Sequence, residues 1–483
     1  MISTAKHDLR ASEVASMLTS GPQDAIPTKS LHQTFRQIQR LALCLVMSGL
    51  LVGCDLFSKG DDSDPSLDEL LEETLAAAAP GQGMAAFELP ESTDFASIPQ
   101  DPNNPVTAKK VELGQLLYHE TGLLTNPTRP EGLHTASCAS CHHAAAGFQA
   151  GVIQGVGEGG FGFGTDGSSR VNDPNYALEE LDVQPIRTPS AMNGAYQIVN
   201  LWNGQFGATG PNAGTEDRWT PGTPIATNEL GYEGLETQAI GGLGVHRMGL
   251  IDSSLVVTNP TYTTLFAEAF PTVADPFDVE HTGLAIAAFE RTMLSNQAPF
   301  QLWLKGNKNA MTDAEKRGAM LFADKAGCVD CHGGPALSSM TFYALGMNNL
   351  DGPGVYGDFD TAEANLGRAS FTGNAADEYK FKTPQLYNLV DSPFYGHGGN
   401  FRSVREVVEY KNAAVPQNAE VPAGQLAAQF QPLGLTQDEV SDLVAFIEGG
   451  LYDPNLSRYV PSSIPSGNCL VVNDTQSRAD LGC

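Results

Sequence analysis

The sequence predicts a mainly α fold of two domains, with long irregular loops between the helices. Three observations predict it. One five-residue stretch occurs twice, and a helical pattern of the same kind precedes each copy. The connecting segments are rich in Gly and Pro, of which the 483-residue chain holds 51 and 30. Because both residue types interrupt regular elements, we expect short helices joined by loops.

The repeated stretch is a Cys-x-x-Cys-His motif, which is typical of c-type haem attachment. The two thiols add across the haem vinyl groups, and the adjacent imidazole ligates the iron. A redox disulfide or half of a zinc site also uses a Cys-x-x-Cys pair, but a redox motif does not need His next in both copies. The sequence therefore predicts two covalent haems c, with His142 and His332 as proximal iron ligands. The attachment residues are Cys138, Cys141, Cys328 and Cys331.

A glycine recurs in the helical pattern before each motif. Gly114 is followed four residues later by Tyr118, and Gly318 is followed four residues later by Phe322. Residues four apart lie on one helical face. Since glycine lowers helix stability, we expect another helix to cross closely at both positions, as at the start of a cytochrome c domain.

The second domain has a recognisable first and last helix. Thr312 and Glu315 form a capping box for the first, while Thr436 and Glu439 form one for the last, which ends at Gly449. Apolar residues at i, i+3, i+4 and i+7 give the last helix a buried face. We expect these two helices to bracket one haem.

The chain divides by composition and motif. Residues 55–106 are acidic and rich in Pro and Gly, which predicts a tether. One short helix is expected inside it, capped by Ser66 and Glu69. The glycine-rich tract Gly155–Gly167 lacks a phosphate-binding context, so we interpret it as a surface loop. The predicted parts are a signal peptide with a lipobox (1–54), the tether (55–106), an N-terminal haem c domain (107–310), a C-terminal cytochrome c domain (311–454) and an irregular tail (455–483).

The N-terminal segment predicts export. The apolar run Leu41–Val52 follows Arg36 and Arg40 and is too short to span a bilayer. It ends at Cys54 in the pattern of a bacterial lipoprotein signal, and the alternative is an ordinary secretory peptide. Either interpretation puts the mature chain in the periplasm or cell envelope. The lipoprotein signal additionally predicts a lipid anchor at Cys54 as the only membrane contact. A disulfide between the two cysteines of the tail is compatible with that compartment.

The chain is strongly acidic, with a formal net charge of −29. Such a chain does not bind nucleic acid by neutralising phosphates. It suits a basic electron-donor protein that is steered by complementary charge. Adaptation to a saline habitat explains the same charge.

A series of shorter motifs resembles the bacterial di-haem cytochrome c peroxidases and their MauG-type relatives over about residues 107–450. The motifs follow in the order that this family has, around the two haem motifs. They are Gly164-Thr165-Asp166-Gly167, Arg187-Thr188-Pro189-Ser190, Leu201-Trp202-Asn203-Gly204, Leu235-Glu236-Thr237-Gln238-Ala239, Ala287-Ala288-Phe289-Glu290-Arg291-Thr292, Phe381-Lys382-Thr383-Pro384 and Phe394-Tyr395-Gly396-His397-Gly398-Gly399.

The resemblance implies an oxidoreductase that reduces hydrogen peroxide to water. The first haem meets the peroxide on an open distal side. The second is six-coordinate and passes on electrons from a small donor protein, a cytochrome c or a cupredoxin. A MauG-type oxidase acting on another substrate is the first alternative, and a non-enzymatic di-haem electron carrier is the second. The resemblance also suggests a homodimer.

The first haem pocket departs from the family pattern. Peroxidases of the family carry a proton-transferring glutamate after the motif that contains Gln238, and Arg247 stands at that position here. Arginine cannot act as a base, although it can stabilise a departing hydroxide. His246 can shuttle the proton instead, or it can ligate the first iron. Gln238, His246 and Arg247 are therefore the predicted catalytic residues.

The second pocket departs as well. The family's distal ligand, Met or Tyr, follows eight residues after the Ser or Thr that opens a late helix, and counting from Ser403 gives Lys411. Tyr410 is adjacent, and both an amine and a tyrosinate can ligate haem iron. Met340 and Met347 are alternatives, although a methionine there more often serves packing.

Two further positions bear on cofactors and electron transfer. Arg187 stands where family members carry an Asn that helps to bind calcium, which makes calcium doubtful here. Trp202 is either a relay between the haems or an ordinary core aromatic.

Overall fold

A computed structural model describes residues 64–250 and 255–483, and Pro65–Cys483 form one compact unit. The predicted signal peptide and lipobox lie outside the described residues. Within the described ranges, none of the helices is long and apolar enough to cross a membrane.

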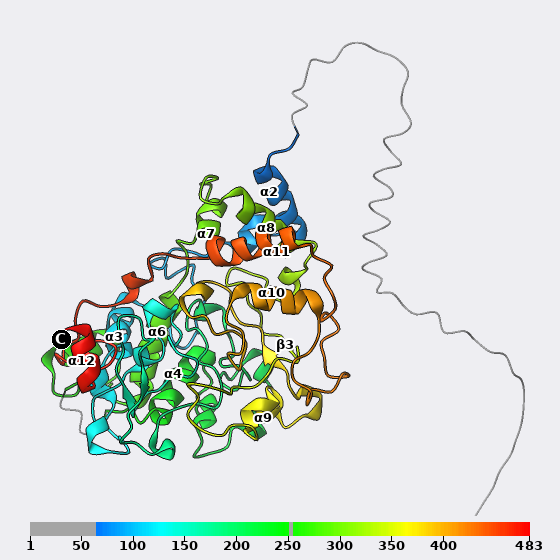
Figure 1. Cartoon of the computed structure of the whole chain (residues 1–483). Helices are drawn as coiled ribbons and strands as arrows, with labels where there is room; N and C mark the ends of the chain where they lie inside the picture. The colour runs from blue at the N-terminus through cyan, green and yellow to red at the C-terminus, as the bar shows by residue number, and fades with distance from the viewer. Residues whose placement is uncertain (1–63, 251–254) are drawn as a thin grey trace, which may run out of the picture. The chain divides into compact units, whose positions relative to one another are not determined.

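Short helices dominate the unit, which confirms the predicted mainly α fold (Figure 1). The strands form two small antiparallel pairs: β1 (Gly160–Phe161) with β2 (Val171–Asn172), and β3 (Phe342–Tyr343) with β4 (Phe381–Lys382). The helices are α2 (Leu67–Ala78), α3 (Ala108–Tyr118), α4 (Gly234–Val245), α5 (Pro260–Ala269), α6 (Val279–Thr292), α7 (Pro299–Leu304), α8 (Asp313–Ala323), α9 (Ala369–Thr372), α10 (Val404–Ala413), α11 (Gln437–Ala445) and α12 (Thr475–Leu481).

The first helix group consists of α3, α4, α5 and α6, and it surrounds one hydrophobic cluster that Cys138 contacts. Helix α3 crosses α6 at Gly114, where an added Cβ would lie 1.9 Å from the carbonyl oxygen of Ala285. The predicted close crossing at Gly114 is therefore confirmed.

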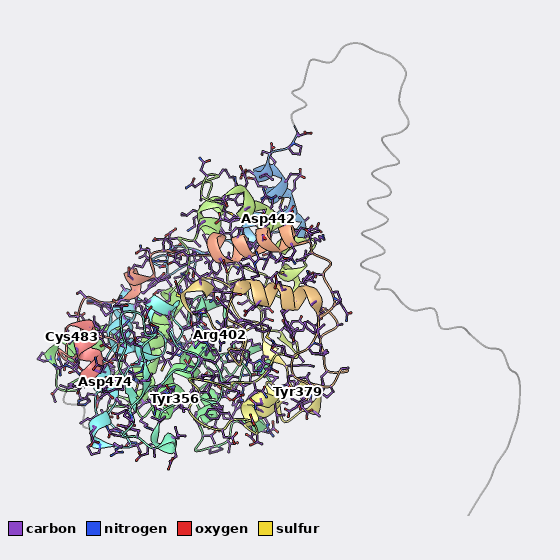
Figure 2. All side chains as sticks on the ribbon, in the orientation of Figure 1. Tyr356, Tyr379, Arg402, Asp442, Asp474 and Cys483 are labelled. Atoms are coloured by element: carbon purple, nitrogen blue, oxygen red, sulfur yellow. A yellow bond between two sulfur atoms is a disulfide. The ribbon has the colours of Figure 1, made fainter. Side chains whose placement is uncertain are left out.

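The second helix group consists of α2, α8, α10 and α11, and its hydrophobic cluster contacts Cys328. Gly318 of α8 lies against the backbone of α11, since an added Cβ would meet the carbonyl oxygen of Asp442 at 2.0 Å. Figure 2 labels Asp442 on this helix. Both predicted capping boxes are present, at Thr312 and at Thr436. Helices α8 and α11, the predicted first and last helices of the second domain, thus cross at a glycine, as predicted.

The described part of the predicted tether, residues 64–106, packs against the rest of the protein. Helix α2 begins at the predicted Ser66 capping box and packs against α8. Leu71 and Leu89 are fully buried in the second cluster, and Trp303 donates a hydrogen bond of 2.6 Å to Asp68. The apolar residues between the acidic ones are numerous enough to bury this segment, which composition alone did not reveal.

The C-terminal tail is more regular than predicted, because it ends in α12 (Figure 1). This helix contacts β1. Cys469 and Cys483 form a disulfide with a Cα–Cα distance of 5.7 Å. Figure 2 labels Asp474 and Cys483 at this end of the chain, and Asp474 pairs with the buried Arg170 at 3.2 Å. The tail therefore packs onto the first half of the chain, whereas the N-terminal segment packs onto the second half.

Candidate functional site

A single cavity of about 690 Å³ runs through the compact unit, and both Cys-x-x-Cys-His motifs line it. The lining is mostly apolar, with a small number of charged side chains. This combination is typical of a cofactor pocket. The fold thus brings the two motifs, far apart in sequence, to one continuous space.

The first motif forms a tight turn, Cys138–Ser140, and the imidazole of His142 follows it. The Nδ1 of His142 lies 3.3 Å from the carbonyl oxygen of Phe148. The hydroxyl of Tyr118 donates to the carbonyl of His142 at 2.8 Å. These bonds fix the ring and leave its Nε2 for another partner.

The second motif repeats this arrangement. Its turn, Cys328–Asp330, precedes His332, whose Nδ1 lies 3.1 Å from the carbonyl oxygen of Leu337 and 3.0 Å from that of Pro384. A histidine that donates Nδ1–H to a carbonyl presents Nε2 to a metal. Both motifs therefore hold their histidine with Nδ1 at a backbone carbonyl and Nε2 available for a metal.

The residues present fit two haems of the c type. All four motif cysteines are unpaired, although the same chain contains a disulfide elsewhere. Burial lowers the pKa of His142 and of His332 to about 4, which keeps both imidazoles in the neutral form that ligates metals. In the ranges that the structure covers, no cluster of three or more His, Cys, Asp or Glu side chains is arranged for a metal ion. The zinc alternative thus has no ligand set there.

The glycine-rich tract predicted as a surface loop is largely buried. A Cβ at Gly155 would lie 3.0 Å from the Sγ of Cys141, and one at Gly157 would lie 2.2 Å from a carboxylate oxygen of Asp182. The glycines let this backbone lie directly against the first motif and its pocket. The prediction of a surface loop was wrong, because the lack of a phosphate-binding context does not by itself place a glycine-rich tract on the surface.

Three residues of α4 and its end face the first motif. Gln238, Gly242 and His246 follow one another at intervals of four and all line the cavity. Gly242 has no side chain, and the amide of Gln238 lies over it, since an added Cβ would be 3.1 Å from the Nε2 of Gln238. The Nδ1 of His246 lies 3.0 Å from both carboxylate oxygens of Asp182. Burial lowers the pKa of His246, but the Asp182 carboxylate outweighs it and the net pKa is raised.

Arg247 does not line this cavity. Its backbone is left-handed, with φ of 59°, which turns the side chain away from the pocket. The guanidinium pairs with the fully buried carboxylate of Glu158 and donates to the carbonyl of Glu180 at 2.8 Å. The predicted catalytic role of Arg247 has no geometric support, because a buried carboxylate already holds this cation.

Glu290, which lies in the family-like motif Ala287–Thr292, is a site residue for which the sequence predicted no role. It is 7% exposed, lines the cavity and has no hydrogen-bond partner on Oε2. Burial, and then the charge of Glu236, raises the pKa of Glu290 to about 8. Its neighbour Arg291 pairs with Glu236 at 2.7 Å and so does not neutralise Glu290 directly. A glutamate in the middle of an apolar helical run was the available signal.

The second motif faces α10. Lys411 lines the cavity, and burial lowers the pKa of its amine to about 8. Tyr410 does not line it, and its hydroxyl donates to the carbonyl of Leu345 at 2.5 Å. Met347 lines the cavity, whereas Met340 does not. Of the two predicted iron ligands Lys411 and Tyr410, only Lys411 therefore lines the cavity.

Several polar groups line the cavity between the two motifs. The indole of Trp202 donates to the carbonyl of Arg187 at 2.7 Å and meets the ring of His397 edge-on. The guanidinium of Arg187 is fully buried and donates to the carbonyls of Ala150 at 2.9 Å and Val152 at 2.6 Å. The guanidinium of Arg187 therefore already binds these carbonyl oxygens. Trp202 forms part of the cavity wall.

Comparisons with known proteins agree with this geometry. Residues 108–309 match the sequence profile of the family described as di-haem cytochrome c peroxidase. The chain is 28% identical to the methylamine utilization protein MauG of Methylorubrum extorquens, over 78% of this chain and 87% of that protein. It is also 28% identical to the cytochrome c peroxidase Ccp of Escherichia coli, over 72% of this chain and 60% of that protein.

A solved structure shares the fold. It is a MauG-like protein associated with microbial copper homeostasis, with a TM-score of 0.55 and 24% identity. The match covers 77% of this chain and 96% of the other.

Proposed function

This chain belongs to the di-haem cytochrome c peroxidase and MauG family, and from that premise we propose that it reduces hydrogen peroxide to water with electrons from a small redox protein. It is a peroxidase-like oxidoreductase of the di-haem class. We propose covalent attachment through the two cysteines of each motif, with His142 and His332 as the proximal ligands. The donor is proposed to be a cytochrome c or a cupredoxin, drawn to the acidic chain.

The single observation that carries this proposal is the shared cavity, which both haem motifs line. Among the described residues, its only carboxyl side chains are Asp182 and Glu290, and both act on cysteines of the first motif. When bound, haem supplies the one-electron iron chemistry that peroxide reduction requires. Reduction of one peroxide to two waters consumes two protons and two electrons. The chain must therefore deliver protons near one motif and leave the other for electron entry.

We propose that His246 holds and transfers the proton at its Nε2. The Asp182 carboxylate orients the ring through Nδ1 and stabilises the protonated form. Gln238 lies on the same side of the cavity and is proposed to orient the bound peroxide by hydrogen bonding. Glu290 is proposed as a second proton source, since its raised pKa keeps it protonated at neutral pH.

A stopped-flow measurement of the peroxide reaction tests the role of His246. The haem-loaded His246→Gln variant should react about 10²–10⁴-fold more slowly, the range usual for loss of a general acid or base. His281→Gln is a matched control, because His281 pairs with Asp278 at 2.8 Å outside the cavity. An unchanged rate in His246→Gln would refute the acid–base role.

Two other functions are distinguished by the same samples. A first haem that is low-spin and indifferent to peroxide in both oxidation states would mean that His246 ligates the iron, and the protein would then be an electron carrier. A reactive species that persists until an organic or protein substrate is added would indicate a MauG-type oxidase. The lysine facing the second motif, where a peroxidase has methionine, favours this oxidase as the second candidate.

The remaining assignments rest on sequence patterns and on Arg187. We propose that the mature chain lies in the periplasm or cell envelope, anchored through lipid at Cys54, and that it forms a homodimer. The guanidinium of Arg187 already occupies a set of buried carbonyl oxygens. We therefore propose that no calcium ion binds at this position.

A further inference from the structure

Lys411 differs from the other lysines of the described ranges. Each of the others makes at least one hydrogen bond or ion pair through its ammonium group. Lys411 alone makes none, although it lies inside the protein on the cavity wall. A buried amine without a partner costs free energy, so a partner is expected in the cavity that it faces.

The helix that carries Lys411 fixes its direction. Ser403 caps α10, and Val404, Val407, Val408 and Lys411 recur at the i, i+3, i+4 and i+7 spacing of one helical face. All four line the cavity. Leu443 and Ile447 line the same part of it from the α11 side. The amine of Lys411 thus projects from an apolar wall into the cavity that is proposed to hold the second haem.

The second motif lies opposite this wall. The charge of Lys411 acts on Cys328, Cys331 and His332, and on no cysteine or histidine of the first motif that has a resolved shift. A haem attached to Cys328 and Cys331 and ligated by His332 would therefore have Lys411 among its neighbours. Tyr410 does not line the cavity, and its ring packs against that of Phe430.

We propose that the side-chain amine of Lys411 is the sixth ligand of the second haem iron, an assignment that rests on the proposed two-haem function. The ammonium releases one proton to solvent, and the nitrogen lone pair forms the coordinate bond. Iron keeps its oxidation state in this step. No additional reactant is needed.

Two other cavity-lining side chains that could ligate iron already have partners within the protein. Lys382 is held by the amide oxygen of Gln197. His397 stacks on Phe381 with ring centroids 3.7 Å apart and lies 3.3 Å from the amide oxygen of Asn349. Met347 remains the strongest rival, since it also lines the cavity and a thioether can ligate haem iron.

An amine ligand has a predictable effect on the second haem. Methionine as an axial ligand raises the reduction potential of a c-type haem. Lys411 should therefore give the second haem a lower potential than methionine would at the same position. Lys411→Met should raise the potential of this haem and introduce the far-red absorption band of methionine–iron ligation.

The direct test is electron–nuclear double resonance on the ferric, haem-loaded protein grown with ¹⁵N-labelled lysine. A ¹⁵N coupling to one low-spin haem is expected, and it should vanish in Lys411→Ala. Lys382→Gln and Tyr410→Phe are matched controls that should retain it. These readouts do not depend on peroxide activity.

The outcomes separate this inference from the proposed function. Two bound haems without a lysine coupling, or a coupling that survives in Lys411→Ala, would overturn the ligand assignment alone. A methionine band in the unmodified protein would assign the ligand to Met347 instead. Absence of a second haem would overturn the proposed function and the ligand assignment together.

Discussion

Replacement of Gly318 by alanine tests whether the α8–α11 crossing sets the fold around the second haem. The added methyl carbon would lie 2.0 Å from the carbonyl oxygen of Asp442 and 2.7 Å from the Cβ of Phe446. Ordinary contacts of carbon atoms begin at about 3.5 Å. The two helices must therefore separate by on the order of 1 Å, and neither neighbour is the end of a flexible side chain.

The free energy change has two opposing parts. Alanine in place of glycine favours the helix by about 1 kcal/mol. Overpacking typically costs about 1–3 kcal/mol and occasionally more, and here backbone meets backbone. We expect the penalty to lie at the upper end, for a net destabilisation of about 2 kcal/mol. The thermal midpoint should then fall by about 2–4 °C.

Gly244→Ala is the matched control for this experiment. Gly244 also lies in a helix, α4, but nothing lies within 4 Å of an added Cβ there. This variant should be as stable as the wild type or more stable by up to about 1 kcal/mol. Calorimetry of the haem-loaded proteins measures both midpoints. If Gly318→Ala matched or exceeded the wild-type midpoint, the argument that the crossing requires glycine would be refuted.

The other predictions concern the first pocket. Glu290→Gln tests the buried carboxyl: its pKa is raised from 4.5 to about 8, so its stabilising contribution is complete below pH 4.5 and falls as the pH rises to about 8. Between pH 4.5 and 8, the free energy of unfolding of the glutamine variant should rise relative to the wild type by about 1.4 kcal/mol per pH unit. Equal pH dependence of the two unfolding free energies would contradict this. Replacing Cys469 and Cys483 by serine should lower the free energy of unfolding of the tail by about 2–3 kcal/mol. Because Ser137 and Ser140 donate to the carbonyl of Val471 within that loop, limited proteolysis should increase and the first-haem spectrum should change, whereas a change in the second haem alone would argue against this contact.

Local rules explain which features could be predicted from the sequence. The haem motifs, the capping boxes and the two crossing glycines each depend on residues within about one or two helical turns. Gly114 and Gly318 were informative because a glycine in a helix has a cost that only close packing offsets. The structure supplies that packing at Ala285 and Asp442.

Features that depend on distant residues were not accessible in this way. Asp182 follows the first motif by some forty positions and precedes His246 by more than sixty, so no spacing rule pairs them. Arg247 stood at a catalytic position by counting, but its partner Glu158 comes from the buried glycine-rich loop. The docking of α2 was hidden by the acidic composition around its apolar face.

The charged residues of the cavity support a division of labour between its two ends. Among the described residues that line it, the only carboxyl side chains are Asp182 and Glu290. Asp182 acts on Cys141 and Glu290 acts on Cys138, both in the first motif, whereas Lys411 acts on the second. Protons are consumed where peroxide is reduced, so donors are needed only there. An end without carboxyl groups, whose amine is the proposed sixth iron ligand, suits a haem that passes electrons and does not bind peroxide.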